Sequence, residues 1–310
     1  ILINEPKEYK DLLTLNLKTG ISFPKARAKA LDEYFKKYNL DYSLDINSNN
    51  YAKYHSDITS NSNLDINTFI NQPNNILGIE YIKALMRFNS KINPVPLKRL
   101  GAGYHSLDTR TKLASATGIR TAMANKDNIS GLLPDNCLNI IKNHTTIEYN
   151  DFSTVLGSKL LSMDTLDHIE GINQDLSNRI ANNKYNFTDI ETFIPMLQSK
   201  NYTYSAISRA LLHIILDIKT DDIKEFISNN YVNYAMILGF NKNTGILSEI
   251  NKYTKIPLVS KFATFYKEAD NNQRKMLDIN LKADNLYRMI YMNKTSETLP
   301  TEFQRQIIIK

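Results

Sequence analysis

Residues 115–120, Ser-Ala-Thr-Gly-Ile-Arg, combine the groups with which proteins bind a phosphate. Two hydroxyl residues and a glycine at a helix start leave backbone N–H groups open, and an arginine in the first turns can fold back toward them. Ser115, Thr117 and Arg120 are therefore candidate phosphate ligands. The alternative is an ordinary helix start, in which Ser115 caps the helix and Arg120 is solvated. The pattern alone favours this alternative, because short helix starts rich in serine and threonine are common.

Arg99 is a second candidate ligand, at the end of a short segment bounded by prolines. We expect residues 92–100 to form a strand that ends near Arg99. Ligand-binding groups in open α/β sheets gather at the carboxyl ends of strands, so Arg99 could bind a nucleotide phosphate. The alternative is an ordinary surface arginine.

Two adjacent asparagines, Asn74 and Asn75, stand between Pro73 and an apolar pattern that predicts a helix. Asparagine is a good helix cap, so one explanation is that either residue satisfies the open N–H groups of this helix. The other explanation is that one of them faces a ligand.

Basic and aromatic side chains interleave over residues 200–218. Lys200, Tyr202 and Arg209 could follow a nucleic-acid backbone and stack on unpaired bases. The alternative is a core helix with a solvated face, which we expect for the apolar members of the segment.

Several kinds of catalytic site find no support in the sequence. It contains no HExxH, GxSxG, P-loop or GxGxxG pattern, and none of its five histidines has the spacing of a metal ligand. The single Cys137 excludes an internal disulfide framework and a multi-cysteine zinc site, which fits a reducing, cytoplasmic compartment.

No window is apolar enough to cross a bilayer, so no membrane is expected as a partner. The net charge of +6 points weakly toward polyanions such as nucleic acid.

The 310 residues suffice for two or three domains. Residues 1–144 show a helix–strand–loop–helix pattern of the α/β kind, with helices expected over 5–19, 23–38, 75–88 and 114–125. Successive amphipathic patterns joined by short polar turns predict a helical domain over 145–230. Short β-like runs and a final helical stretch predict a small α/β region over 231–310.

Several segments together resemble the bacterial tRNA(Met) cytidine acetate ligase family, a branch of the HIGH-type nucleotidyltransferases. These segments are, in order, SFPKARAKALDEY, PNNILGIEYIKAL, KRLGAGYH, SATGIR, EGINQDLSNRI, KNYTYSAISRALLHIIL, YAMILGFNKNTG and KIPLVSK. The resemblance spans nearly the whole chain, and it is specific because several motifs agree in order and spacing.

The resemblance implies a Rossmann-like nucleotidyltransferase domain followed by a helical domain that contacts tRNA. It also implies an activity: acetate is activated with ATP, which is accompanied by Mg²⁺, and the acetyl group passes to the wobble cytidine of elongator tRNA(Met). Asn74 and Arg99 match ATP-binding residues of the family. Ser115, Thr117 and Arg120 match the phosphate-binding motif of the superfamily, and Asn75 is then expected to be the plain helix cap.

One departure from the family pattern is the absence of any His-x-Gly-His motif. In the family this motif follows an N-terminal strand, so we expect the front part of the first domain to lie upstream of residue 1 and this chain alone to hold part of the ATP site. Two alternatives stay open: a non-catalytic tRNA- or RNA-binding protein, and a nucleotidyltransferase that adenylates another small acid.

Overall fold

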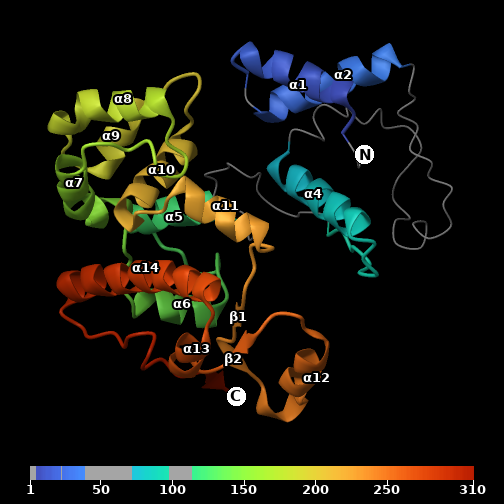
Figure 1. Ribbon diagram of the computed structural model, residues 1–310. Helices are drawn as coiled ribbons and strands as arrows, with labels where there is room; N and C mark the ends of the chain where they lie inside the picture. Colours follow the sequence, from blue (N-terminus) through green and yellow to red (C-terminus); the bar gives the residue numbers. More distant parts are fainter. Residues whose placement is uncertain (1–4, 22, 39–71, 98–113) are drawn as a thin grey trace. The chain divides into compact units, whose positions relative to one another are not determined.

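Helices make up most of the computed structural model, which describes residues 5–21, 23–38, 72–97 and 114–310 (Figure 1). The chain forms two units, Ile1–Leu138 and Asn139–Lys310. None of the helices in these described ranges is long and apolar enough to span a membrane.

In the first unit, helices α1 (Lys7–Lys18) and α2 (Phe23–Lys37) pack against each other. Buried alanines on α2, including Ala26 and Ala30, allow the two helices to approach closely. The ring of Tyr9, 1% exposed, meets the ring of Tyr34 edge-on with centroids 6.3 Å apart. Because this burial disfavours the charged phenolate, the pKa of Tyr9 is raised.

A cluster of four charged side chains joins α2 to helix α4 (Pro73–Arg87). Arg27 and Lys83 are only 6% and 5% exposed. Arg27 Nη2 lies 2.7 Å from Glu80 Oε1, and Lys83 Nζ lies 3.4 Å from the same oxygen and 2.8 Å from Glu5 Oε1. A buried cation without a partner is costly, so two carboxylates for two cations make this burial tolerable.

The described part of the strand expected over 92–100 is not a strand. Residues 92–97 are exposed and belong to no helix or strand, while 98–100 lie outside the described residues. Pro94 and Pro96 explain the error, because each lacks the N–H group that a strand donates to its neighbour. The four helices expected in this half of the chain are confirmed as α1, α2, α4 and α5 (Ala116–Ala124).

The second unit is built around a bundle of short helices, and the successive helical patterns expected there are confirmed. Its members are α7 (Ser153–Ser162), α8 (Gln174–Asn183), α9 (Ile190–Leu197), α10 (Tyr204–Leu216) and α11 (Thr220–Ser228), with 3₁₀ turns η1 (Tyr149–Phe152) and η2 (Lys184–Asn186). Helix α6 (Asp135–Lys142) spans the boundary between the two units. Leu156, Ile180, Phe193 and Leu211 are fully buried at its centre. Period-3.6 apolar positions and polar caps are both local signals, which is why they predict these helices well.

Helix α14 (Asn271–Thr295) lies along this bundle and is held to it by three lysines. Lys275 Nζ lies 2.7 Å from Asp222 of α11, Lys282 Nζ donates to Leu216 O at the end of α10 (2.6 Å), and Lys294 Nζ lies 2.7 Å from Asp151 of η1. Partial burial of the Asp151 carboxylate raises its pKa, but hydrogen bonds from the Glu148 amide and from Lys294 outweigh that effect, so the pKa is lowered.

The small α/β region expected near the C-terminus contains two pairs of short parallel strands. Strand β1 (Ala235–Met236) pairs with β3 (Leu258–Val259), and β2 (Gly239–Phe240) pairs with β4 (Ile308–Ile309). Between them lie η3 (Lys242–Thr244), α12 (Ile246–Tyr253) and α13 (Phe262–Glu268).

We predict that Gly239→Ala loosens β4. A Cβ at position 239 would lie 2.8 Å from Ile308 O and 3.2 Å from its Cβ, so β4 must move and its hydrogen bonds to Leu238 O and Phe240 O weaken. We expect the free energy of unfolding to fall by about 1–3 kcal/mol, the usual cost of overpacking. Limited proteolysis should cut residues 296–310 faster.

The matched control is Gly78→Ala, because a Cβ there has no neighbour within 4 Å. Alanine is the better helix former, so this variant should be neutral or more stable. A C-terminal segment equally protected in Gly239→Ala and in the parent protein would contradict the predicted clash.

Candidate functional site

Ser115 caps helix α5. Its side chain, 1% exposed, accepts a hydrogen bond from the Gly118 N–H (3.0 Å), and its carbonyl accepts from the Ile119 N–H (3.0 Å). The hydroxyl of Ser115 therefore already has a structural role, because it accepts from Gly118 and caps the helix. A bound phosphate would have to share this hydroxyl with the Gly118 amide.

The first two amides of α5, those of Ala116 and Thr117, remain open. Within the described part of the chain no acceptor receives either N–H, as is usual for the first turn of a helix. Both point out of the helix start, where the helix dipole favours an anion. Thr117 and Arg120 are three residues apart, so they lie on the same face of α5, and Arg120 is exposed. The arrangement can bind a phosphate oxygen.

Asn74 lies on a different helix, as the second residue of α4, and it is exposed. The expectation that Asn75 caps this helix is wrong: the cap position is Gln72, which makes no capping hydrogen bond through its side chain. Pro73 is the reason, because its fixed φ suits the first helical position and places both asparagines inside the first turn. Arg99 lies outside the described residues, so its role stays a prediction.

The cluster of Arg27, Glu80 and Lys83 is a feature that the sequence analysis missed. It lies two turns along α4 from Asn74 and holds this helix against α2. Glu80 and Lys83, three residues apart in the mostly apolar middle of this helix, were the available signal. Within the described residues there is no group of three His, Cys, Asp or Glu side chains that could hold a metal ion.

The three candidate RNA ligands of the second unit differ in their surroundings. Tyr202 packs its ring against the core, and its hydroxyl donates to Asn173 Oδ1 (2.6 Å), the atom that also caps α8. Lys200 lies in the turn between the bridged residues Ser199 and Tyr202, and it is exposed. Arg209 is exposed on α10. Tyr202 thus has a structural role, whereas the two cations face solvent.

The model of the HIGH Nucleotidyl Transferase family matches residues 1–302. The tRNA(Met) cytidine acetate ligase of Halothermothrix orenii is 30% identical over 306 residues, covering 94% of this chain and 68% of the relative. The protein of the same name from Clostridium acetobutylicum is 32% identical over 316 residues, covering 100% and 71%.

Two solved structures share the fold. An apo crystal structure of Thermotoga maritima TmcAL has a TM-score of 0.79 at 23% identity and covers all of this chain and 72% of its own. A second crystal form of that protein, bound with alpha-thio ATP, also has a TM-score of 0.79, at 24% identity, covering 100% and 71%. With the family model spanning nearly its full length and relatives at 30% identity or more, the chain belongs to the HIGH nucleotidyl transferase family and groups with its tRNA(Met) cytidine acetate ligases.

Proposed function

We propose that this protein is an ATP-dependent ligase that forms acetyl-adenylate and acetylates the wobble cytidine of elongator tRNA(Met). The observation that carries the proposal is the start of α5. Ser115 caps this helix, no residue in the described ranges accepts a hydrogen bond from the amides of Ala116 and Thr117, and Arg120 lies on the same face as Thr117. The names of the relatives supply the substrate, and the alpha-thio ATP bound to the Thermotoga protein supports the nucleotide.

The proposed reaction has two steps. The carboxylate of acetate attacks the α-phosphorus of ATP, the bond to the bridging oxygen breaks, and pyrophosphate leaves. The exocyclic amine of cytidine then attacks the acetyl carbonyl, AMP leaves, and the amine loses a proton. Both steps place negative charge on phosphate oxygens. Open amides and an arginine already in place stabilise such charge, and no covalent enzyme nucleophile is needed.

The parts of the chain then take separate roles. Residues 1–144 form the remainder of the Rossmann-like nucleotidyltransferase domain, in which Asn74, Arg99, Ser115, Thr117 and Arg120 bind ATP. Residues 145–230 contact the tRNA, and 231–310 form the small C-terminal region. Mg²⁺ accompanies the nucleotide, because this ion is usually bound through the substrate phosphates, one or two carboxylates and several waters. We place the reaction in the cytoplasm, where the tRNA substrate is found.

The first prediction concerns the acid and the acceptor. The protein expressed from its complete gene should catalyse ATP–pyrophosphate exchange that depends on acetate, and should form N4-acetylcytidine in tRNA(Met) transcripts, as measured by mass spectrometry of nucleosides. Exchange supported by another small acid, without tRNA modification, would support a different adenylating enzyme. Binding of tRNA without any exchange would support a non-catalytic RNA-binding protein.

The second prediction separates the two asparagines. Asn74→Ala should weaken ATP binding about ten-fold, the loss expected for one or two hydrogen bonds to a charged ligand, while tRNA affinity is unchanged. Isothermal titration with ATP measures the first quantity and fluorescence anisotropy the second. Asn75→Ala, the neighbour in the same helical turn, is the control and should leave the Kd for ATP unaltered. Equal losses for ATP and tRNA in Asn74→Ala would make Asn74 a folding residue.

The third prediction concerns the exposed cations of the second unit. Lys200→Ala and Arg209→Ala should each weaken tRNA binding, and each should reduce the slope of log K against log salt by about 0.9, the value for one lost phosphate contact. Lys224→Ala is the control, because Lys224 is also exposed but already pairs with Asp221 (2.9 Å). An unchanged affinity and slope in the two test variants would mean that both residues are ordinary surface residues that do not contact the tRNA.

A further inference from the structure

Helix α12 stands apart from the core of the second unit (Figure 1). It belongs to the segment of residues 241–257 that connects β2 to β3. The two ends are fixed by the pairing of β2 with β4 and of β3 with β1. None of the residues of α12 is buried, so the helix owes little of its position to a hydrophobic core.

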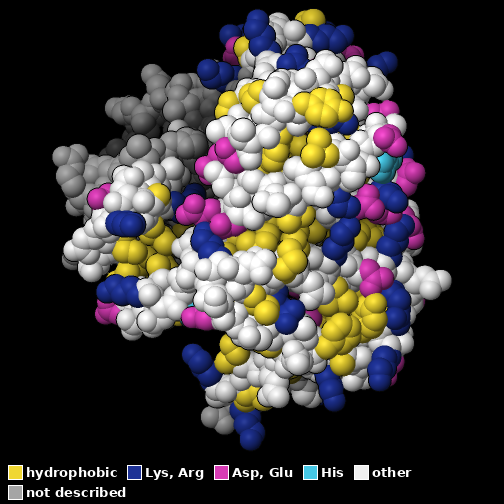
Figure 2. Space-filling model, turned by 90° about the vertical axis from the view of Figure 1, so that its left-hand side faces the viewer, with side chains coloured by type: hydrophobic (Ala, Val, Ile, Leu, Met, Phe, Trp, Pro, Cys, Tyr) yellow, Lys and Arg dark blue, Asp and Glu magenta, His cyan; other side chains and the backbone are white. Residues whose placement is uncertain are grey.

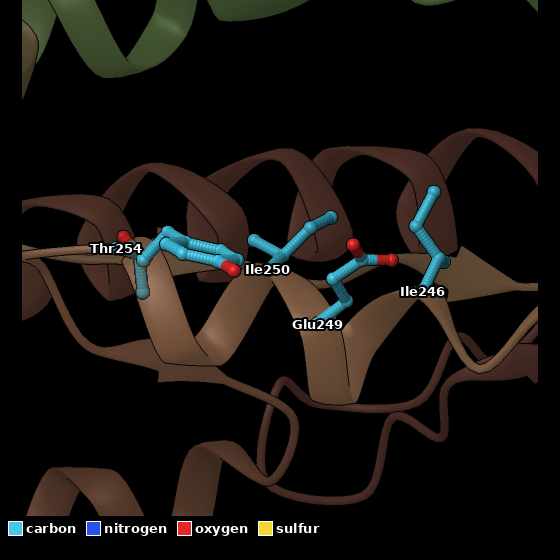
Figure 3. Close-up of a pocket in the computed structure, with 5 residues that line it drawn as sticks. Ile246, Glu249, Ile250 and Thr254 are labelled. Atoms are coloured by element: carbon cyan, nitrogen blue, oxygen red, sulfur yellow. The ribbon is translucent and has the colours of Figure 1, made fainter.

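One face of α12 forms an open apolar groove of about 380 Å³, lined by Ile246, Glu249, Ile250, Tyr253 and Thr254. The first four of these residues follow a spacing of three, one and three, which places them on one side of the helix. Ile246, Glu249 and Ile250 indeed rise on the same side of α12 (Figure 3). Tyr253 is 79% exposed, and Ile250 is 43% exposed. The groove therefore offers apolar surface and one aromatic ring to solvent.

The charge around the groove favours an anionic partner. Lys242, Lys252 and Lys255 are exposed within residues 241–257, and Glu249 is the single carboxylate of this segment. In the part of the chain that the structure describes, none of these lysines forms an ion pair, whereas Lys275 and Lys294 of α14 both do. On the face drawn in Figure 2, by contrast, basic and acidic side chains are interspersed.

We propose that this groove receives an unpaired base of an RNA strand. The ring of Tyr253 stacks on the base, Ile246 and Ile250 form the apolar floor, and Lys252 and Lys255 contact the flanking phosphates. Exposed aromatic rings between lysines bind single strands in this way, since every base has a π face and every linkage a negative charge. A protein partner fits less well, because the groove of one short helix is far smaller than a standard protein interface. The inference rests on the proposed function, in which the substrate is a tRNA.

Glu249 adds a preference among bases. A carboxylate accepts hydrogen bonds and donates none, so it can pair with the N4 amine of cytosine but repels the O4 carbonyl of uracil. Glu249 lies one helical turn before Tyr253 on the same face of α12, within reach of the edge of a base stacked on that ring. The groove therefore selects a base that carries an exocyclic amine.

The test uses fluorescein-labelled heptamers of cytidine and of uridine, with anisotropy as the measurement and the complete protein as the binder. Tyr253→Ala should weaken binding of the cytidine heptamer about ten-fold, the size of one lost base stack, and Tyr253→Phe should restore it. The double variant Lys252→Ala/Lys255→Ala should reduce the slope of log K against log salt by about 0.7 for each phosphate. The cytidine heptamer should bind more tightly than the uridine heptamer, and Glu249→Gln should narrow that difference.

Tyr38→Ala is the matched control. Tyr38 is 44% exposed and has Lys37 Nζ 5.5 Å from its ring centroid, but it belongs to the first unit, outside the α12 groove and outside the residues proposed to contact tRNA. It should leave binding unchanged, and an equal loss in Tyr38→Ala and Tyr253→Ala would overturn the proposal. So would an RNA affinity that is unchanged in Tyr253→Ala while self-association, measured by sedimentation, is lost, because the groove would then bind a second copy of the chain.

The exchange reaction separates this inference from the proposed function. Tyr253→Ala should keep the acetate-dependent exchange of the parent protein, since α12 has no part in adenylation. If the parent protein shows no exchange but binds the cytidine heptamer through Tyr253, the proposed function fails and the RNA groove is supported. If exchange is present and no heptamer binds, the groove proposal is overturned.

Discussion

The open hydrogen-bonding groups at helix ends are the constraint on which most of this structure depends. The helices are short, so a large share of their backbone N–H and C=O groups lies at an end and needs a partner outside the helix. Asn173, Asp189 and Thr203 supply that partner at the starts of α8, α9 and α10. Lys282 supplies it at the end of α10. At α5 the hydroxyl of Ser115 accepts from one amide, while two further amides have no acceptor among the described residues and form part of the proposed phosphate site.

The same need for a partner applies to buried charged groups. Arg27 and Lys83 are buried only because Glu80 and Glu5 accompany them, and the lysines of α14 each meet an acid or a carbonyl. Most cations described in α14 and α4 are thus used to hold helices together. Arg120, Lys200, Arg209 and Lys252 are exposed, and none of them forms an ion pair with another described residue. They are therefore available to an anionic ligand.

Local signals predicted the helices well, because apolar periodicity and capping residues act within a few positions of one another. The strand expected over 92–100 is wrong in its described part, 92–97, because two prolines there lack the N–H groups that a strand donates to its neighbour. Asn75 was mistaken for a cap because Pro73 starts α4 earlier. Contacts between residues far apart in the sequence could not be predicted. Tyr202 contacts Asn173, 29 positions away, and Arg27 contacts Glu80, 53 positions away, and no local sequence pattern predicts either contact. The groove on α12 was visible only as a tyrosine near lysines.

The pairing of β2 with β4 has a consequence for the order of folding. Gly239 and Ile308 are register partners 69 residues apart, and the strands are parallel, so a long loop must close before this contact forms. The bundle around Phe193 and Leu211 can assemble from neighbouring segments while synthesis continues. The pairing of β2, which precedes the α12 segment, cannot form until residues 308 and 309 of β4 have left the ribosome. We therefore expect the helix bundle to fold first and the β2–β4 pair to form only near the end of translation.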